Sequence, residues 1–274
     1  MSPSLAGEAA LEFAAMSIRL WNQAAGLPVP AGATRRAAIV ALPPGTPDVV
    51  QLFEFMRDAE LRFGTLRMRI QERTIGSRGE QLRLIEVVLR HPGQARVTTS
   101  DPGRGLSGNY QVWLSDGETV RTYSGVHRLG TRRPVRPTVE GLDNRDLPGM
   151  STVYRPLTAL QAESLADAFV HPAGFCQNVL ATGDCSIAGT ADQAGREALV
   201  LECAHPRSAD VWADRPEHRL QVTVDRETGV ITRLIEMVGD QVTRDAEVVS
   251  LEPDAPLPAA AFDFTLPTDA TLLY

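Results

Sequence analysis

The fold of this chain is decided by residues 65–90, TLRMRIQERTIGSRGEQLRLIEVVLR. Leu66, Met68 and Ile70 alternate with polar residues, which is the period-two pattern of a half-buried strand. Residues 76–79 predict a turn, and residues 80–90 predict the returning strand. The alternation breaks near Ile85, so a β-bulge is predicted there. The stretch is therefore read as an antiparallel hairpin with one apolar face.

Further hairpins are predicted along the rest of the chain. The clearest turn is Asp116–Gly117, a strong hairpin dipeptide. The additional strands are expected at residues 95–100, 110–115, 118–124, 186–191, 196–203, 217–225, 230–238 and 241–251. Repeated antiparallel hairpins with few helices predict an α+β chain built on one large antiparallel sheet of nine or ten strands.

Three segments have helical character. Residues 46–63 begin with Thr46 as the expected N-cap, Pro47 at the first position and Asp48 in the first turn. Residues 157–181 form a second helix that Pro172 and Gly174 should break in two. Residues 4–25 predict an amphipathic N-terminal helix.

The remaining segments set the expected domain organisation. Residues 26–46 are rich in Pro, Gly and Ala and are interpreted as a linker, whereas residues 128–156 predict a long irregular loop. We therefore expect an N-terminal helix and linker over residues 1–45 and one domain over residues 46–274. The longest apolar run, residues 37–42, is too short for a membrane span, and residues 1–25 lack the pattern of a secretory signal.

The charge distribution argues against nucleic acid as a partner. All 27 basic residues apart from His are arginine, and the net charge is −7. Residues 1–137 are basic and residues 138–274 are strongly acidic. A basic half can steer anionic partners, but aromatic residues make up only 5% of this acidic chain, and nucleic-acid binding is not predicted.

Sequence motifs for catalysis or metal binding are missing. The five histidines do not have the spacing of a zinc helix, and the chain contains no nucleophile elbow, phosphate loop or dinucleotide fingerprint. We predict neither an enzyme activity nor a cofactor nor a metal site.

The three cysteines leave two disulfide pairings open. Cys185 and Cys203 flank the turn near residue 194 symmetrically, so a regular hairpin would place them opposite each other. Cys176 with Cys185 is the rival pairing. A disulfide would indicate an oxidising compartment, whereas three buried thiols in a cytoplasmic protein is the alternative.

The second half of the chain resembles a known superfamily. The stretches are GREALVLE (195–202), HRLQVTVDRETGVITRLIEM (218–237) and VVSLEPDAPLPAAAFDFTLP (248–267). Their order, after a helix that runs into an Arg-alternating strand, is similar to that of the outer-membrane lipoprotein-sorting proteins. This group includes LolA-like carriers, actinobacterial cell-envelope lipoproteins and RseB-like stress sensors. The resemblance covers about residues 46–267.

The resemblance implies a curved half-barrel with helices plugging its concave face around an apolar cavity. It also implies an extracytoplasmic carrier for the acyl chains of a lipoprotein or lipid or, as the alternative, a sensor that binds a membrane or envelope protein. Candidate cavity residues, which would otherwise be ordinary core, are Phe53, Met56, Leu66, Met68, Ile70, Leu82, Leu84, Val112, Leu114, Leu160 and Phe169. Candidate headgroup or partner contacts, which would otherwise be solvated, are Arg128, Arg132, Arg133 and Arg136.

Overall fold

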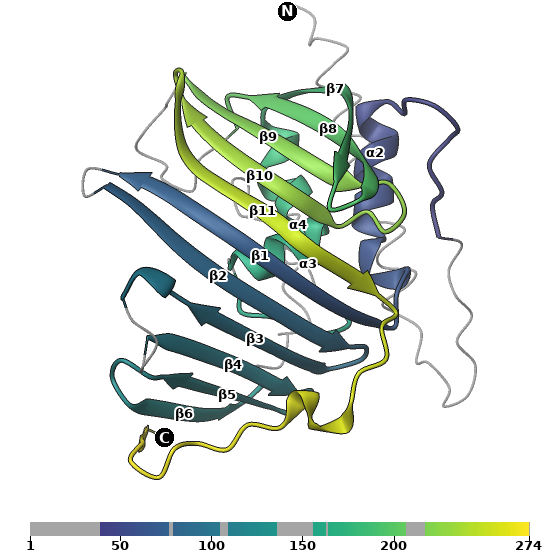
Figure 1. Ribbon diagram of the computed structural model, residues 1–274. Helices are drawn as coiled ribbons and strands as arrows, with labels where there is room; N and C mark the ends of the chain where they lie inside the picture. Colours follow the sequence, from purple (N-terminus) through teal and green to yellow (C-terminus); the bar gives the residue numbers. More distant parts are fainter. Residues whose placement is uncertain are drawn as a thin grey trace, which may run out of the picture. The chain divides into compact units, whose positions relative to one another are not determined.

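The structure is a computed structural model that describes residues 39–76, 79–104, 109–135, 156–162, 164–206 and 217–273 (Figure 1). From Val40 onward these residues belong to one compact unit. The predicted helix 4–25 and Arg136 lie outside the described residues. The domain boundary at residues 45 and 46 stays a prediction.

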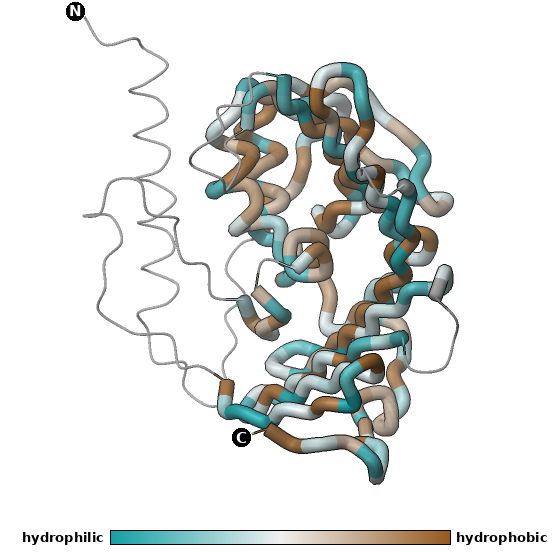
Figure 2. The backbone as a smooth tube through the Cα atoms, turned by 90° about the vertical axis from the view of Figure 1, so that its left-hand side faces the viewer, coloured by the Kyte–Doolittle hydropathy of each residue, from teal (hydrophilic) through white to brown (hydrophobic). Residues whose placement is uncertain are grey.

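One open sheet of twelve strands forms the frame of the described chain, in the order β12-β6-β5-β4-β3-β2-β1-β11-β10-β9-β8-β7. All neighbouring pairs are antiparallel except β12 and β6. The α+β class and the curved antiparallel sheet with helices on its concave face are confirmed (Figures 1 and 2). The strands are β1 (Thr65–Gly76), β2 (Gly79–Arg90), β3 (Gln94–Ser100), β4 (Tyr110–Asp116), β5 (Thr119–Ser124), β6 (Leu129–Pro134), β7 (Asp184–Gln193), β8 (Arg196–Ala204), β9 (His218–Asp225), β10 (Ile231–Val238), β11 (Gln241–Pro253) and β12 (Thr271–Leu273).

Two strands lie where the sequence predicted none. β6 begins the stretch expected to be irregular, and β12 lies at the C-terminal end. β6 was missed because its residues, LGTRRP, lack the apolar alternation of a half-buried strand, and only the three-residue β12 lies outside it. β12 has three exposed residues and therefore carries no pattern at all.

The hairpin of β1 and β2 has a continuous register, so the bulge predicted near Ile85 is wrong. Ile85, Val87 and Leu89 all face the buried side of the sheet, and Leu82 and Leu84 face the other side. The apolar alternation along β2 changes phase because its first apolar residues, Leu82 and Leu84, face the convex side, whereas Ile85, Val87 and Leu89 face the concave side. A register shift occurs instead in the pairing of β1 with β11, between Arg69 and Ile70.

Short helices cover the concave face over the second half of the sheet: α2 (Val49–Arg57), α3 (Leu165–Val170) and α4 (Pro172–Asn178) (Figure 1). The N-cap of α2 is Asp48, so the prediction of Thr46 was wrong. Asp48 and Gln51 form a reciprocal capping box, which satisfies two backbone N–H groups at once. The second helical segment breaks at Pro172 as expected, whereas Gly174 lies inside α4.

Within the described residues, no helix is both long and apolar enough to cross a membrane.

Candidate functional site

The concave apolar cluster is the part of the molecule that most closely matches the predicted cavity. It joins seven of the candidate residues, all at most 9% exposed and all in one contiguous core: Phe53, Met56, Leu66, Met68, Ile70, Leu160 and Phe169. The sheet supplies the floor from β1, where every second side chain points the same way. The helices α2 and α3 and the segment 156–162 supply the cover.

Four further candidates do not join this cluster. Leu82, Leu84, Val112 and Leu114 lie on the convex face, because the register places them one residue out of phase with Met68 and its cross-strand partners. Leu84 is 37% exposed. Val112 and Leu114 are buried, but outside the concave cluster.

Polar contacts fasten the cover to the sheet. The Thr158 hydroxyl accepts a hydrogen bond from the Gly93 N–H at 2.9 Å and shares another with His91 Nδ1 at 2.7 Å. The Leu157 N–H donates to Glu60 at 2.8 Å. Burial, followed by the nearby His171, lowers the pKa of His91 to about 4. The segment 156–162 is therefore held by specific polar groups, as a closing cover would require.

The floor of the cluster ends at a buried carboxylate. Glu72 follows Ile70 on the same face of β1 and is 2% exposed. Arg83 and Arg244 each approach its carboxylate to 3.0 Å, and Arg244 also reaches Glu236 at 2.9 Å. Sequence reasoning missed this group, although a charged residue in an apolar alternation was the available signal.

The predicted arginine loop is largely a strand. Arg132 and Arg133 lie on β6 and point to opposite faces, with Arg132 on the convex side and Arg133 on the concave side. Arg128 precedes β6 and forms an ion pair with Asp269 at 2.9 Å. The described arginines therefore do not gather at the edge of the concave cluster, where the headgroup of a bound lipid would lie.

The cysteines lie as the symmetric hairpin predicted. Cys185 on β7 is the direct partner of Cys203 on β8, while the Cys176 thiol lies 3.7 Å from the Met56 sulfur. All three are free thiols. Burial raises the pKa of Cys176, and a hydrogen bond with Cys185 lowers the pKa of Cys203.

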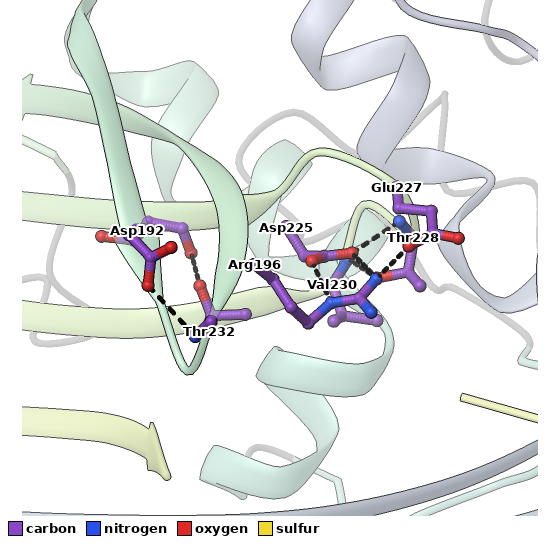
Figure 3. A network of polar contacts seen from close by, with 9 residues as sticks. Asp192, Arg196, Asp225, Glu227, Thr228, Val230 and Thr232 are labelled. Carbon is purple, nitrogen blue, oxygen red and sulfur yellow. Dashed lines mark hydrogen bonds and ion pairs between the residues drawn. The ribbon is translucent and has the colours of Figure 1, made fainter. Parts of the chain in front are cut away.

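Two of the motifs that carried the family resemblance meet in one network (Figure 3). Arg196, from the Gly-Arg-x-Ala stretch, binds both carboxylate oxygens of Asp225 at 2.7 and 3.1 Å. Thr228, from the Val-Asp-x-x-Thr-Gly stretch, donates its N–H and its hydroxyl to the same carboxylate. These motifs therefore close the turn between β9 and β10 and bind it to β8, while Gly229 of the same turn lies against Phe55 of α2.

In the part of the chain that the structure describes, no group of three His, Cys, Asp or Glu side chains is arranged to hold a metal ion. The concave cluster offers apolar contact area and one charged border.

No protein-family model matches the chain, and no curated protein matches it in sequence. Similar solved structures exist. A crystal structure of MucB has a TM-score of 0.46 and 17% identity, covering 78% of this chain and 62% of MucB. An uncharacterized conserved protein from Thermus thermophilus has a TM-score of 0.45 and 11% identity over 81% of this chain and 97% of its own.

A LolA superfamily protein, NE2245 from Nitrosomonas europaea, has a TM-score of 0.32 and 12% identity over 80% of this chain and 99% of its own. The chain spans 62% of the length of MucB. The described residues are similar in fold to LolA superfamily proteins and to MucB.

Proposed function

We propose that this chain is a non-enzymatic binder of acyl chains, carried by a lipoprotein or a lipid in the cell envelope outside the cytoplasm. The ligand would lie between the concave face of β1 and the helices α2 and α3. The observation that supports this most is the concave apolar cluster itself, which is continuous across both layers.

The thin cover makes uptake physically reasonable. α3 has six residues and α4 has seven, so neither is stable as an isolated helix; α3 depends on packing against β10 and α4 on packing against α2 and α3. An acyl chain gains about 0.8 kcal/mol for each buried CH₂ group and can replace that packing. Leu66, Met68 and Ile70 are at most 1% exposed, so uptake would require the cover, formed by α2, α3 and the segment 156–162, to separate from the floor.

The test is native mass spectrometry of the full chain, followed by organic extraction and titration with a fluorescent long-chain fatty acid. We expect a bound acyl species or saturable probe binding. Met68→Phe should weaken probe binding about tenfold by filling the floor, a loss of about 1.4 kcal/mol. Leu84→Phe, on the convex face of the neighbouring strand, should have no effect. If the purified protein holds no acyl species and does not bind the probe, the proposal is rejected.

The second candidate function is a sensor that binds a protein partner. It is favoured by the nearly complete burial of the floor by the chain's own side chains, which leaves no need for a ligand to cover it. Protein that stays empty and captures no probe, but retains a defined peptide ligand, would support this alternative.

A further inference from the structure

The C-terminal tail, residues 254–273, covers part of the convex face opposite the concave cluster. After the short turn Ala259–Phe262, it continues without regular structure and directs Phe262, Phe264 and Leu266 towards the protein, while the residues between them are exposed. The Phe264 ring lies 5.7 Å from that of Tyr123. Leu266 lies so close to Gly130 that a Cβ there would approach it to 3.0 Å. The tail is therefore an extended segment packed on apolar side chains of the sheet.

The surface beneath the tail follows one row of side chains across the strands. Thr98, Val112, Tyr123 and Gly130 are successive partners on β3, β4, β5 and β6. Val112 and Tyr123 are at most 5% exposed, although they are not part of the concave cluster. This face consequently has an apolar centre of its own.

The adjacent row is positively charged and only partly compensated: the Thr119 N–H first, and the Arg121 charge as well, lower the pKa of Asp116 on the neighbouring strand. Arg96, Leu114, Arg121 and Arg132 are successive partners across the same four strands. Arg121 and Arg132 lie directly opposite each other, an arrangement that destabilises a sheet unless an anion compensates it. In the described part of the chain, no carboxylate forms an ion pair with either residue or with Arg96.

The tail satisfies the apolar row but not the charged one. Arg96 contacts it through the Asp263 carbonyl at 3.3 Å and through the Phe264 ring. The ion pair that the tail forms, Arg128 with Asp269, is mostly exposed and therefore weak. β12 pairs over only three residues, and Leu272 and Leu273 are 40% and 50% exposed. A segment held in this way opens at low cost.

We infer that the convex face of β3–β6 is a binding surface for an extended acidic segment of another protein, with apolar side chains at alternate positions. The C-terminal tail occupies its apolar row within the same chain and competes with the partner. The partner's carboxylates neutralise the arginine row that the tail leaves uncompensated. This inference does not depend on acyl binding at the concave cluster.

The test uses two fluorescent peptides and the full chain. One peptide copies residues 258–273, and the other carries Thr265→Glu and Thr268→Glu. A tethered tail acts at an effective concentration of roughly millimolar, so both peptides should bind weakly to the unmodified chain. In Phe264→Ser, whose tail is loosened, we expect the acidic peptide to bind about tenfold tighter than the copy. Leu266→Ser, which removes the contact of the tail with Gly130, is the second variant should Phe264→Ser not fold.

A matched pair of arginine variants locates the binding face. Arg132→Ser should weaken the acidic peptide about tenfold, whereas Arg133→Ser, the next residue on the opposite face, should leave its affinity unchanged. Equal affinity for both peptides, equal losses in both arginine variants, or no binding to either tail variant would overturn the inference. Binding of phosphatidylglycerol vesicles through Arg132 without peptide binding would also overturn it, and would assign the face to a membrane surface.

Discussion

At Asp225, a carboxylate that is 1% exposed receives two hydrogen bonds from the Arg196 guanidinium and two from Thr228. Burial by itself would raise the pKa of Asp225, but these hydrogen bonds outweigh it and lower the pKa below its ordinary value of 3.8. Glu227 also contacts Arg196, but its side chain is 78% exposed. The two carboxylates that pair with Arg196 thus differ in burial, and their contributions to stability should differ accordingly.

We predict that Asp225→Asn lowers the free energy of unfolding by about 3 kcal/mol, because it leaves a partly buried guanidinium with only the exposed Glu227 as its charge partner. Glu227→Gln should cost less than about 1 kcal/mol, since exposed ion pairs contribute little. Urea unfolding of the two variants measures both values. Similar losses in the two would show that burial is not the deciding factor.

The same carboxylate predicts a pH dependence. Because its folded pKa lies below its unfolded value, Asp225 contributes stability above about pH 4 and loses that contribution as the pH falls further. The difference in unfolding free energy between the native chain and Asp225→Asn should therefore shrink below about pH 4. A constant difference down to about pH 2 would contradict this assignment.

At the scale of elements, α2 depends on its first turn. Asp48 accepts the Gln51 N–H at 2.8 Å, and the Gln51 side chain accepts a hydrogen bond from the Asp48 N–H in return. Asp48→Ala should cost about 1 kcal/mol, whereas Thr46→Ala, two residues earlier and exposed, should cost almost nothing. Thermal unfolding monitored by circular dichroism compares them. A larger loss of stability in Thr46→Ala than in Asp48→Ala would show that Thr46, the residue predicted from sequence, is the N-cap.

The β7–β8 hairpin brings Cys185 and Cys203 together as direct partners. With oxidised glutathione, we predict that the two thiols lose two electrons and two protons to form a disulfide, while the glutathione disulfide is reduced to two thiols. A loop of this size should gain about 3 kcal/mol in stability. Mass mapping after alkylation identifies the pair, and Cys176→Ser should not change it. A Cys176–Cys185 link would support the rival pairing instead.

At the scale of the whole molecule, the helical layer is joined to the sheet through the turn between β2 and β3. His91 lies in that turn, stacked on Phe63 and hydrogen bonded to Thr158. Its pKa of about 4 lies below the ordinary value of 6.5. Between these two pH values, His91 is therefore protonated in the unfolded chain and neutral in the folded chain. The His91 contribution to stability is therefore complete above pH 6.5 and declines as the pH falls towards 4.

We predict that stability falls between pH 6.5 and about 4, and that His91→Gln flattens this part of the profile. Urea midpoints measured at several pH values provide the comparison, and His127→Gln, at an exposed turn, serves as the control. An unchanged slope in His91→Gln would assign the pH dependence to other groups.

Much of the architecture was readable from local patterns. The alternation of Leu66, Met68 and Ile70 predicted the floor of the concave cluster. The dipeptide Asp116–Gly117 predicted the hairpin of β4 and β5, and the symmetric spacing of Cys185 and Cys203 predicted that they are partners. These features depend on the side-chain period of a strand or on turn chemistry, both of which act over a few residues.

The sequence alone thus determined ten of the twelve strands of the described sheet, the apolar face of β1 and the presence of helices that cover it. Only the tertiary structure decided that Leu82, Leu84, Val112 and Leu114 lie on the convex face, that Glu72 is enclosed by two arginines, and that the tail returns to β6. An alternating pattern shows that a strand has two faces, but the face that each residue joins depends on register with distant strands. That register is set by packing across the whole sheet.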